Sequence, residues 1–116
     1  NNINYLTELA TTHYRLKNYD EAIETYNKII SIEGNNSFAY NNIGNIYSIK
    51  KDCANAESYF RKAIEIDPGS IPSYSNLALM FDENNRKDEA IEVLKQGIEK
   101  NPNSFELKIT LKIVGE

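Results

Sequence analysis

The sequence of 116 residues is poor in the side chains on which many functional sites depend. It contains one cysteine, one histidine and no tryptophan. A single cysteine cannot close a disulfide within the chain and fits a reducing compartment. The chain also lacks a paired-cysteine or HExxH metal motif and a glycine-rich phosphate loop. We therefore expect no bound metal and no cofactor.

Long apolar runs and an excess of positive charge are missing as well. No stretch approaches the roughly 20 apolar residues that span a bilayer, so we expect no membrane insertion. The net charge is −4, which argues against nucleic-acid binding because such binding needs a positive surface. No signal peptide is visible, so a cytoplasmic location is expected. The chain begins at Asn1 rather than Met, as in a trimmed piece that could have lost a targeting segment.

The residues that could take part in catalysis have structural explanations. His13 falls on an apolar helical stripe, where a packed and hydrogen-bonded histidine is expected. Cys53 lies at a turn into a helix, where a buried structural thiol is expected, without the electropositive setting that makes a thiol reactive. The acidic pair Asp20 and Glu21 suits the first turn of a helix, where the helix dipole favours negative charge. We therefore expect that the chain is not an enzyme.

A period of 34 residues organises the chain, with alanine at positions 22, 56 and 90. Upstream of each alanine is a stripe with the i, i+3, i+4, i+7 spacing of one helix face. These stripes are Leu6, Leu9, Ala10 and His13; Tyr40, Ile43, Gly44 and Tyr47; and Tyr74, Leu77, Ala78 and Phe81. A second stripe begins at each alanine. The sequence therefore predicts three helical hairpins, which must stack on one another to bury their apolar faces.

Small residues are expected to let the two helices of a hairpin approach closely. In the middle hairpin, Gly44 on the first helix should face Ala56 on the second. A larger side chain at such a contact would overpack it.

This pattern resembles the tetratricopeptide repeat family. The middle repeat carries the signature of the family at Tyr40, Ile43, Gly44, Tyr47, Ala56, Phe60, Ala63 and Pro68. The resemblance implies an all-α fold, an α-solenoid of three antiparallel helical hairpins within a single domain of residues 1–116. The repeats are expected at residues 3–36, 37–70 and 71–104. His13 and Ile29 depart from the pattern, which suggests looser packing in the first repeat.

The tail of the chain predicts one more helix, at residues 105–114. Leu107, Leu111 and Val114 form a stripe that can cover the third repeat as a capping helix. Ile109 and Ile113 fall on a different face. These two are candidate interface residues, either for a partner or for self-association through the ends of the array.

In the family that the chain resembles, the first helix of each repeat lines a concave groove that holds the ligand. Transferred to this sequence, the stripe opposite the core gives the candidate groove residues Thr11, Tyr14, Phe38, Asn41, Asn42, Asn45, Asn76 and Leu79. Family members with asparagine ladders in this groove bind peptide backbones, and the resemblance implies the same here.

Three of these asparagines stand within five residues of one expected helix, although asparagine is a poor helix former. Asn41, Asn42 and Asn45 share one face of that helix. A carboxamide both donates and accepts hydrogen bonds, so it can pair with a peptide group whatever the side chain of the ligand. The alternative is compositional bias, because asparagine is also frequent outside the groove.

One subclass of the family clamps the C-terminal carboxylate of chaperones through basic residues and asparagines. The corresponding positions here are Thr7, Thr11, Asn42, Pro72 and Asn76. Of these only Asn42 matches, and every basic residue is missing. We therefore expect no chaperone carboxylate clamp.

The function expected from the sequence is a non-catalytic protein-interaction scaffold whose groove binds an extended peptide of a partner protein. The alternative is a structural or oligomerisation module that packs against itself or the rest of a longer protein. A third hypothesis is that the chain is a sensor or regulatory appendage to an enzyme.

Overall fold

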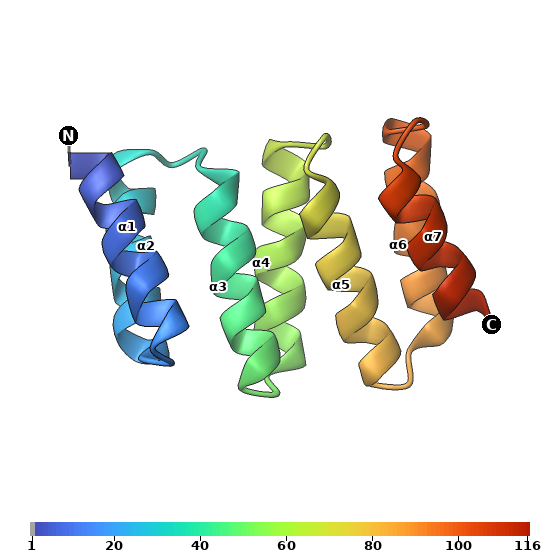
Figure 1. Cartoon of the computed structure of the whole chain (residues 1–116), viewed down its shortest axis with the longest axis horizontal. Coiled ribbons are helices and arrows are strands. Elements are labelled where there is room, and N and C mark those ends of the chain that lie inside the picture. Colours follow the sequence, from blue (N-terminus) through green and yellow to red (C-terminus); the bar gives the residue numbers. More distant parts are fainter. Residues whose placement is uncertain (1) are drawn as a thin grey trace.

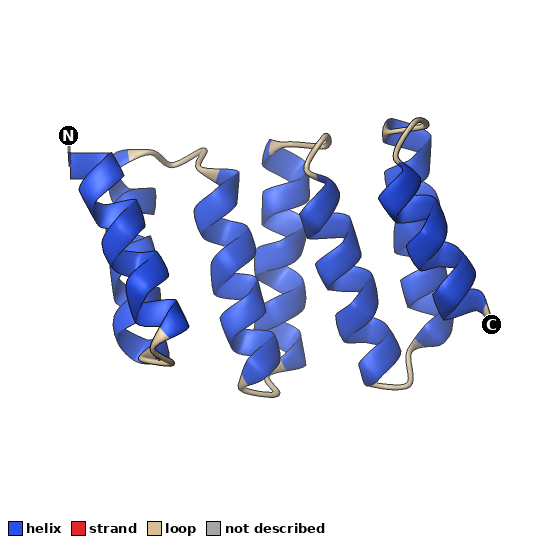
Figure 2. Ribbon diagram, viewed as in Figure 1, coloured by secondary structure: helices blue, strands red, loops and turns tan. Residues whose placement is uncertain are grey.

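The computed structural model describes residues 2–116, and the seven elements within that range are all α-helices. Their bounds are α1 (Asn2–Arg15), α2 (Tyr19–Ile32), α3 (Ser37–Ile49), α4 (Cys53–Ile66), α5 (Ile71–Glu83), α6 (Lys87–Lys100) and α7 (Phe105–Gly115). Figure 2 shows that only short loops connect them. The predicted hairpins therefore correspond to α1–α2, α3–α4 and α5–α6, with α7 as the additional helix.

The helices stand side by side in chain order, with the two ends of the chain at opposite ends of the molecule (Figure 1). The principal extents of 42 × 27 × 20 Å describe an elongated body. Each helix packs on the next along the chain, and α5 also packs directly on α3 and on α7. The expected all-α solenoid is confirmed, and α5 lies between α3 and α7 in one layer and contacts both.

The apolar stripes predicted from the sequence form the core. One cluster of buried residues joins the first hairpin to α3 and contains Ala10, Ala22 and Ile43. A second cluster runs from α4 to α7 and contains Phe60 and Leu94. Each hairpin is therefore stabilised by burial against its neighbour, as the stacking argument requires.

The close contact in the middle hairpin differs in detail from the prediction. A Cβ added to Gly44 would lie 2.8–3.1 Å from three carbons of the Phe60 ring. Real Cβ atoms do not approach ring carbons this closely, so the aromatic ring, rather than Ala56, is what requires a glycine here. Phe60 lies one helical turn beyond Ala56, and its ring fills the space over Gly44.

His13 and Cys53 are both less buried than the sequence predicts. His13 is only half-buried, yet its Nδ1 atom is enclosed and has no hydrogen-bond partner, so the expected hydrogen-bonded histidine is wrong at this atom. The corresponding position of the next two hairpins holds the rings of Tyr47 and Phe81. This position is thus one at which the repeat ordinarily packs an apolar ring. Cys53 is half-buried and packs against the second core cluster.

Side-chain caps fix the start of three helices. The side-chain oxygen of Asn36 accepts a hydrogen bond from the backbone N–H of Ala39. Asp52 and Ser104 accept equivalent bonds at the starts of α4 and α7. Such caps satisfy backbone donors that have no partner within the helix, and each contributes roughly 0.5–2 kcal/mol.

The three turns inside the hairpins share one backbone conformation. Lys17, Lys51 and Asn85 have positive φ values of 64°, 67° and 61°. In each turn the N–H of the following residue donates to the carbonyl five residues earlier, as from Asp52 to Tyr47 at 2.9 Å. This is the Schellman arrangement, in which glycine is the usual left-handed residue. The hairpins therefore carry lysine or asparagine where the backbone favours glycine.

Replacing Lys51 by glycine is expected to raise the free energy of unfolding by roughly 0.5–1 kcal/mol. The left-handed conformation costs a residue with a Cβ about 1–2 kcal/mol, and part of this gain is offset by the greater freedom of glycine in the unfolded chain. Asn85→Gly is the comparison and should gain less, because asparagine tolerates this conformation better. Urea denaturation measures both; an equal or larger gain at Asn85 would contradict the argument.

Candidate peptide-binding groove

Two adjoining hollows lie on the surface made by α1, α3 and α5. The first, of about 240 Å³, is lined by Thr11, Tyr14, Tyr26, Phe38 and Asn42. The second, of about 230 Å³, is lined by Tyr14, Asn45, Ser48, Ile49, Asn76, Leu79, Met80 and Glu83. Tyr14 belongs to both, so the two hollows form one continuous surface, which we call the groove. Seven of the eight candidate residues taken from the sequence line it.

Tyr26 organises the first hollow, and its place in the groove was not predicted from the sequence. It lies on α2, is almost fully buried and meets Phe38 edge-on with ring centroids 6.3 Å apart. Burial raises the pKa of its hydroxyl, while side-chain hydrogen bonds with Thr11 and Asn42 act in the opposite direction. The tyrosine hydroxyl therefore positions two of the polar groups of the groove.

A signal for this role is present in the sequence. The positions that correspond to Tyr26 in the next two repeats hold Phe60 and Leu94, which have no polar atom in the side chain. A buried hydroxyl needs a hydrogen-bond partner, so a tyrosine at this position calls for polar neighbours on the facing helices.

Asn41 is the candidate that lies outside both hollows. Its side chain is only 9% exposed, and its Oδ1 atom accepts a hydrogen bond of 3.3 Å from Nδ2 of Asn76. The prediction placed Asn41 on the open face of the helix; the structure instead places it in the contact between α3 and α5. Because α5 packs directly on α3, the amide of Asn41 holds Asn76 in position.

The apolar members of the groove are only partly covered. Phe38 is 50% exposed, Ile49 45% and Leu79 42%. The pKa of the neighbouring Tyr14 hydroxyl is raised by burial and then by Tyr19, which it meets edge-on at 6.0 Å. The groove thus combines amide groups with apolar side chains that retain surface for a ligand to cover.

The middle of the groove carries no positive charge. Neither α3 nor α5 contains a lysine, arginine or histidine. Arg15 stands at the α1 end, near Glu8, where both line a shallow depression with three threonines. Glu83 lies at the α5 end. The interface candidates Ile109 and Ile113 are on α7 and are 46% and 65% exposed.

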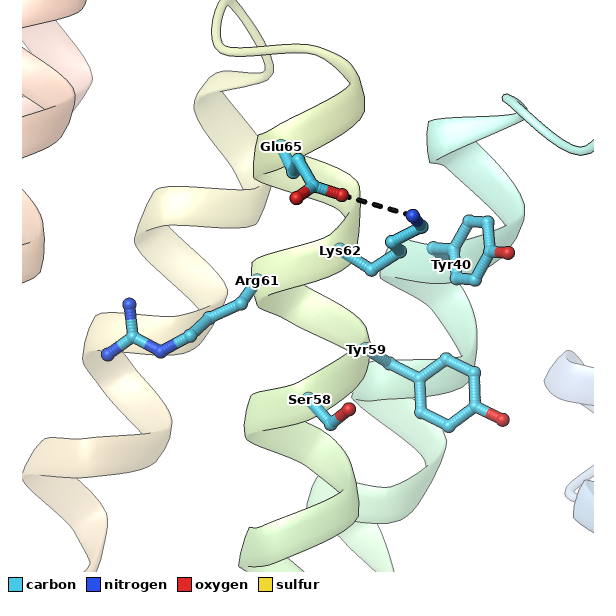
Figure 3. A pocket seen from close by; sticks show the side chains of 6 residues that line it. All are labelled: Tyr40, Ser58, Tyr59, Arg61, Lys62 and Glu65. Carbon is cyan, nitrogen blue, oxygen red and sulfur yellow. Dashed lines mark hydrogen bonds and ion pairs between the residues drawn. The ribbon is translucent and has the colours of Figure 1, made fainter.

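Another hollow, of about 310 Å³, lies on the α3–α4 hairpin and is lined by Tyr40, Ser58, Tyr59, Arg61, Lys62 and Glu65. Figure 3 shows the Lys62 amine beside Tyr40 and paired with Glu65 at 3.0 Å, whereas Arg61 points away from the two tyrosines. The ring of Tyr59 also stacks on Tyr47 at 5.6 Å. The tyrosines therefore pack α3 on α4, and the charged groups do not converge on one point.

Residues 2–116 provide neither a metal-binding cluster nor a membrane-spanning helix. This part of the chain holds no cluster of three histidine, cysteine, aspartate or glutamate side chains that could bind a metal ion. Among the described helices, none combines the length and the apolar character that crossing a bilayer requires.

Comparison with known proteins places the chain among helical repeats. A family model described as tetratricopeptide repeat matches residues 1–69 and again residues 36–101. The small glutamine-rich tetratricopeptide repeat-containing protein 2 of Mycosarcoma maydis is 30% identical over 92 residues. The match covers 79% of this chain and 26% of that protein, so the chain spans about a quarter of the length of this relative.

Solved structures show the same architecture. The first TPR domain of Spaghetti (RPAP3), bound to the HSP90 peptide SRMEEVD, superposes with a TM-score of 0.81 and 25% identity, covering 97% of this chain and 90% of that one. The TPR2B domain of yeast Sti1, in complex with pHsp70, gives a TM-score of 0.84 at 18% identity, with 98% and 96% covered. At 18% identity, the similarity to the Sti1 domain shows a shared fold and nothing more.

Proposed function

The chain belongs to the tetratricopeptide repeat family, and on this premise we propose that it is a protein-interaction scaffold whose groove binds an extended peptide segment of a partner protein. The observation that carries the proposal is that seven of eight residues selected from the sequence line two adjoining hollows that share Tyr14. Binding modules of this fold are typically non-catalytic. The peptide complex of the Spaghetti domain supports the class of ligand.

The amides at the centre of the groove are oriented before a ligand arrives. Asn42 lies close enough to the hydroxyl of Tyr26 to lower its pKa, and Asn76 donates a hydrogen bond to Asn41. Each amide keeps further donor or acceptor capacity, which can pair with the N–H and C=O groups of an extended backbone. Side chains that are already held in place lose less entropy when the ligand binds.

Amide hydrogen bonds alone are too weak to hold a peptide. Each contributes about 0.5–1.5 kcal/mol net, whereas association costs an estimated 4–15 kcal/mol or so. Burying apolar surface must supply the remainder, at roughly 25 cal/mol per Å². Phe38, Ile49 and Leu79 have the exposed surface to do so. We therefore propose binding in the micromolar to millimolar range.

The proposed ligand is not an acidic chaperone tail. At four of the five positions where the family's carboxylate clamp places basic residues or asparagines, this chain has Thr7, Thr11, Pro72 and Asn76, and none of these supplies a positive charge. Hydrogen bonds to ionised groups are roughly twice as strong as neutral ones, so their loss removes the main attraction for a terminal carboxylate. The likeness to Spaghetti supports a peptide ligand without supporting the same peptide.

A structural role is the second candidate, favoured by apolar side chains at the ends of the array. Tyr5 and Leu16 on the first hairpin, and Phe105 at the start of α7, are strongly exposed. Light scattering of the peptide-free protein distinguishes the two: the scaffold proposal expects a monomer at micromolar concentration, and the structural alternative expects a larger assembly.

The double variant Asn42→Ala/Asn76→Ala tests the groove. A random twelve-residue peptide library displayed on phage is selected on the wild-type protein, and the enriched peptides are made synthetically. We expect the double variant to bind them about tenfold more weakly, because it loses two hydrogen bonds of ~0.5–1.5 kcal/mol each. Isothermal titration calorimetry measures the affinities.

The matched control is Asn27→Ala, an exposed asparagine on α2 outside both hollows. It should leave the affinity unchanged. Since Asn76→Ala also deprives Asn41 of its donor, thermal unfolding of each variant shows that the fold is retained. The proposal fails if no peptide is enriched, or if the enriched peptides bind the double variant as well as the wild type.

A further inference from the structure

The helix α7 continues the layer that bears the groove. Moving along the chain by 34 residues, Asn41 corresponds to Ser75 and then to Ile109, while Asn45 corresponds to Leu79 and then to Ile113. The helix α7 packs directly on α5. Of the two candidate interface residues, Ile113 therefore stands in register with Asn45 and Leu79, which line the groove. Ile109 stands in register with Asn41 and Ser75, which lie beside the groove in the contacts between neighbouring helices.

A hydrogen bond between α5 and α7 supports this register. The Ser75 hydroxyl, almost fully buried, donates to Oε2 of Glu106 at 3.1 Å. Glu106 is two periods of 34 residues beyond Phe38, which lines the groove. This bond thus fixes a carboxylate of the first turn of α7 beside the groove face of α5.

The other faces of α7 either pack into the core or carry lysines. Leu107 and Val114 are buried in the core. Lys108 and Lys112 are exposed and correspond to Tyr74 and Ala78, which are buried within the third hairpin. A helix that carries lysines at these positions is suited to face water there. Ile109 and Ile113 are exposed and belong to neither core cluster, so they form an open apolar surface.

The charge on α5 has one sign. The helix α5 contains Asp82 and Glu83 and no basic residue. On α7, Glu106 lies toward α5, whereas the two lysines occupy the positions just described. An acidic ligand would be repelled here, and a ligand cation would find a carboxylate on each of the two helices.

From this register and this charge we infer that the groove extends over α7 and selects basic extended peptides. An apolar side chain of the peptide packs on Leu79, Ile109 and Ile113, and a neighbouring lysine or arginine pairs with Glu106 or Glu83. The inference rests on the proposed function and adds the chemical class of the partner segment. It assigns to α7 a binding role besides that of a cap.

The test uses the peptides enriched from the random phage library on the intact chain. We expect lysine and arginine to outnumber aspartate and glutamate among them, with an apolar residue one or two positions from the cation. For the strongest synthetic peptide, a version with glutamine in place of its basic residues is made. Glu106→Gln should weaken the basic peptide about three- to fivefold, as for an exposed ion pair, and leave the glutamine version unchanged.

Ile113→Ser should weaken both versions, because it removes apolar contact rather than charge. Glu24→Gln, at an exposed acid on α2, is the matched control and should change neither. Thermal unfolding of the Glu106 variant shows whether loss of the hydrogen bond from Ser75 disturbs α7. Lys108→Gln removes a charge of opposite sign from the same helix and should not weaken binding of the basic peptide.

The outcomes separate this inference from the proposed function. Enriched peptides that are neutral or acidic, or a Glu106 variant that binds the basic peptide unchanged, overturn the inference while the dependence on Asn42 and Asn76 stands. The absence of enriched peptides overturns the proposed function itself. A dimer in light scattering that Ile113→Ser dissociates also overturns the inference, since a second copy then occupies this face.

Discussion

Phe60→Ala is expected to lower the free energy of unfolding by about 3–5 kcal/mol, the range for removing a fully buried aromatic ring. The side chain of Phe60 is 0% exposed. Its ring carbons would lie 2.8–3.1 Å from a Cβ at Gly44, so α3 and α4 meet across this ring. Alanine would leave a cavity that the glycine opposite cannot fill. Because domains are stable by only about 5–15 kcal/mol, the variant should be close to unfolding at room temperature.

Urea denaturation followed by circular dichroism measures the effect, and Phe105→Ala is the matched control. Phe105 begins α7 and is 76% exposed, so the same substitution should change stability by less than about 0.5 kcal/mol. In a stacked repeat the loss can concentrate in the middle hairpin, which would broaden the transition. If Phe60→Ala lowers the free energy of unfolding by less than about 1 kcal/mol, the hairpin must collapse into the space of the missing ring.

The fold could be predicted from the sequence because it depends on periodicity. Each stripe, such as Ile43 and Gly44 in α3 or Val93 and Leu94 in α6, is buried as the 3.6-residue period requires. The 34-residue period then implies that the hairpins stack. The left-handed turns were not predicted, because Lys17 and Lys51 give no local signal for positive φ. Closure of the hairpin, and not the preference of lysine, sets that backbone conformation.

The groove could be predicted less completely, since a stripe assigns a face but not the partner of each side chain. The faces of Asn42, Asn45 and Asn76 follow from spacing, and all three line the groove. Whether Asn41 remains open depends on how closely α5 approaches α3, which is a property of packing. The bond from Ser75 to Glu106 joins residues 31 apart in sequence. Contacts of that kind are decided by the tertiary structure.

Leu107→Ala is expected to cost about 2–5 kcal/mol, as for other buried leucines, and to act mainly on α7. Leu107 is fully buried, and its Cδ1 lies 3.0 Å from where a Cβ at Gly97 would stand. The helix α7 is the last of the described helices and packs mainly on α5 and α6. Its undocking can therefore precede global unfolding, since terminal elements open at lower free energy than the core.

Hydrogen exchange followed by mass spectrometry resolves this local event. The amides of α7 should exchange faster in the Leu107 variant, and those of α3 should be unaffected. Leu16→Ala, at a leucine that is 65% exposed, is the control and should alter neither. If the groove extends over α7, peptide affinity falls together with the protection of this helix, because Ile109, Ile113 and Glu106 are carried away with it. An undocked α7 with undiminished peptide affinity would restrict the binding surface to α1, α3 and α5.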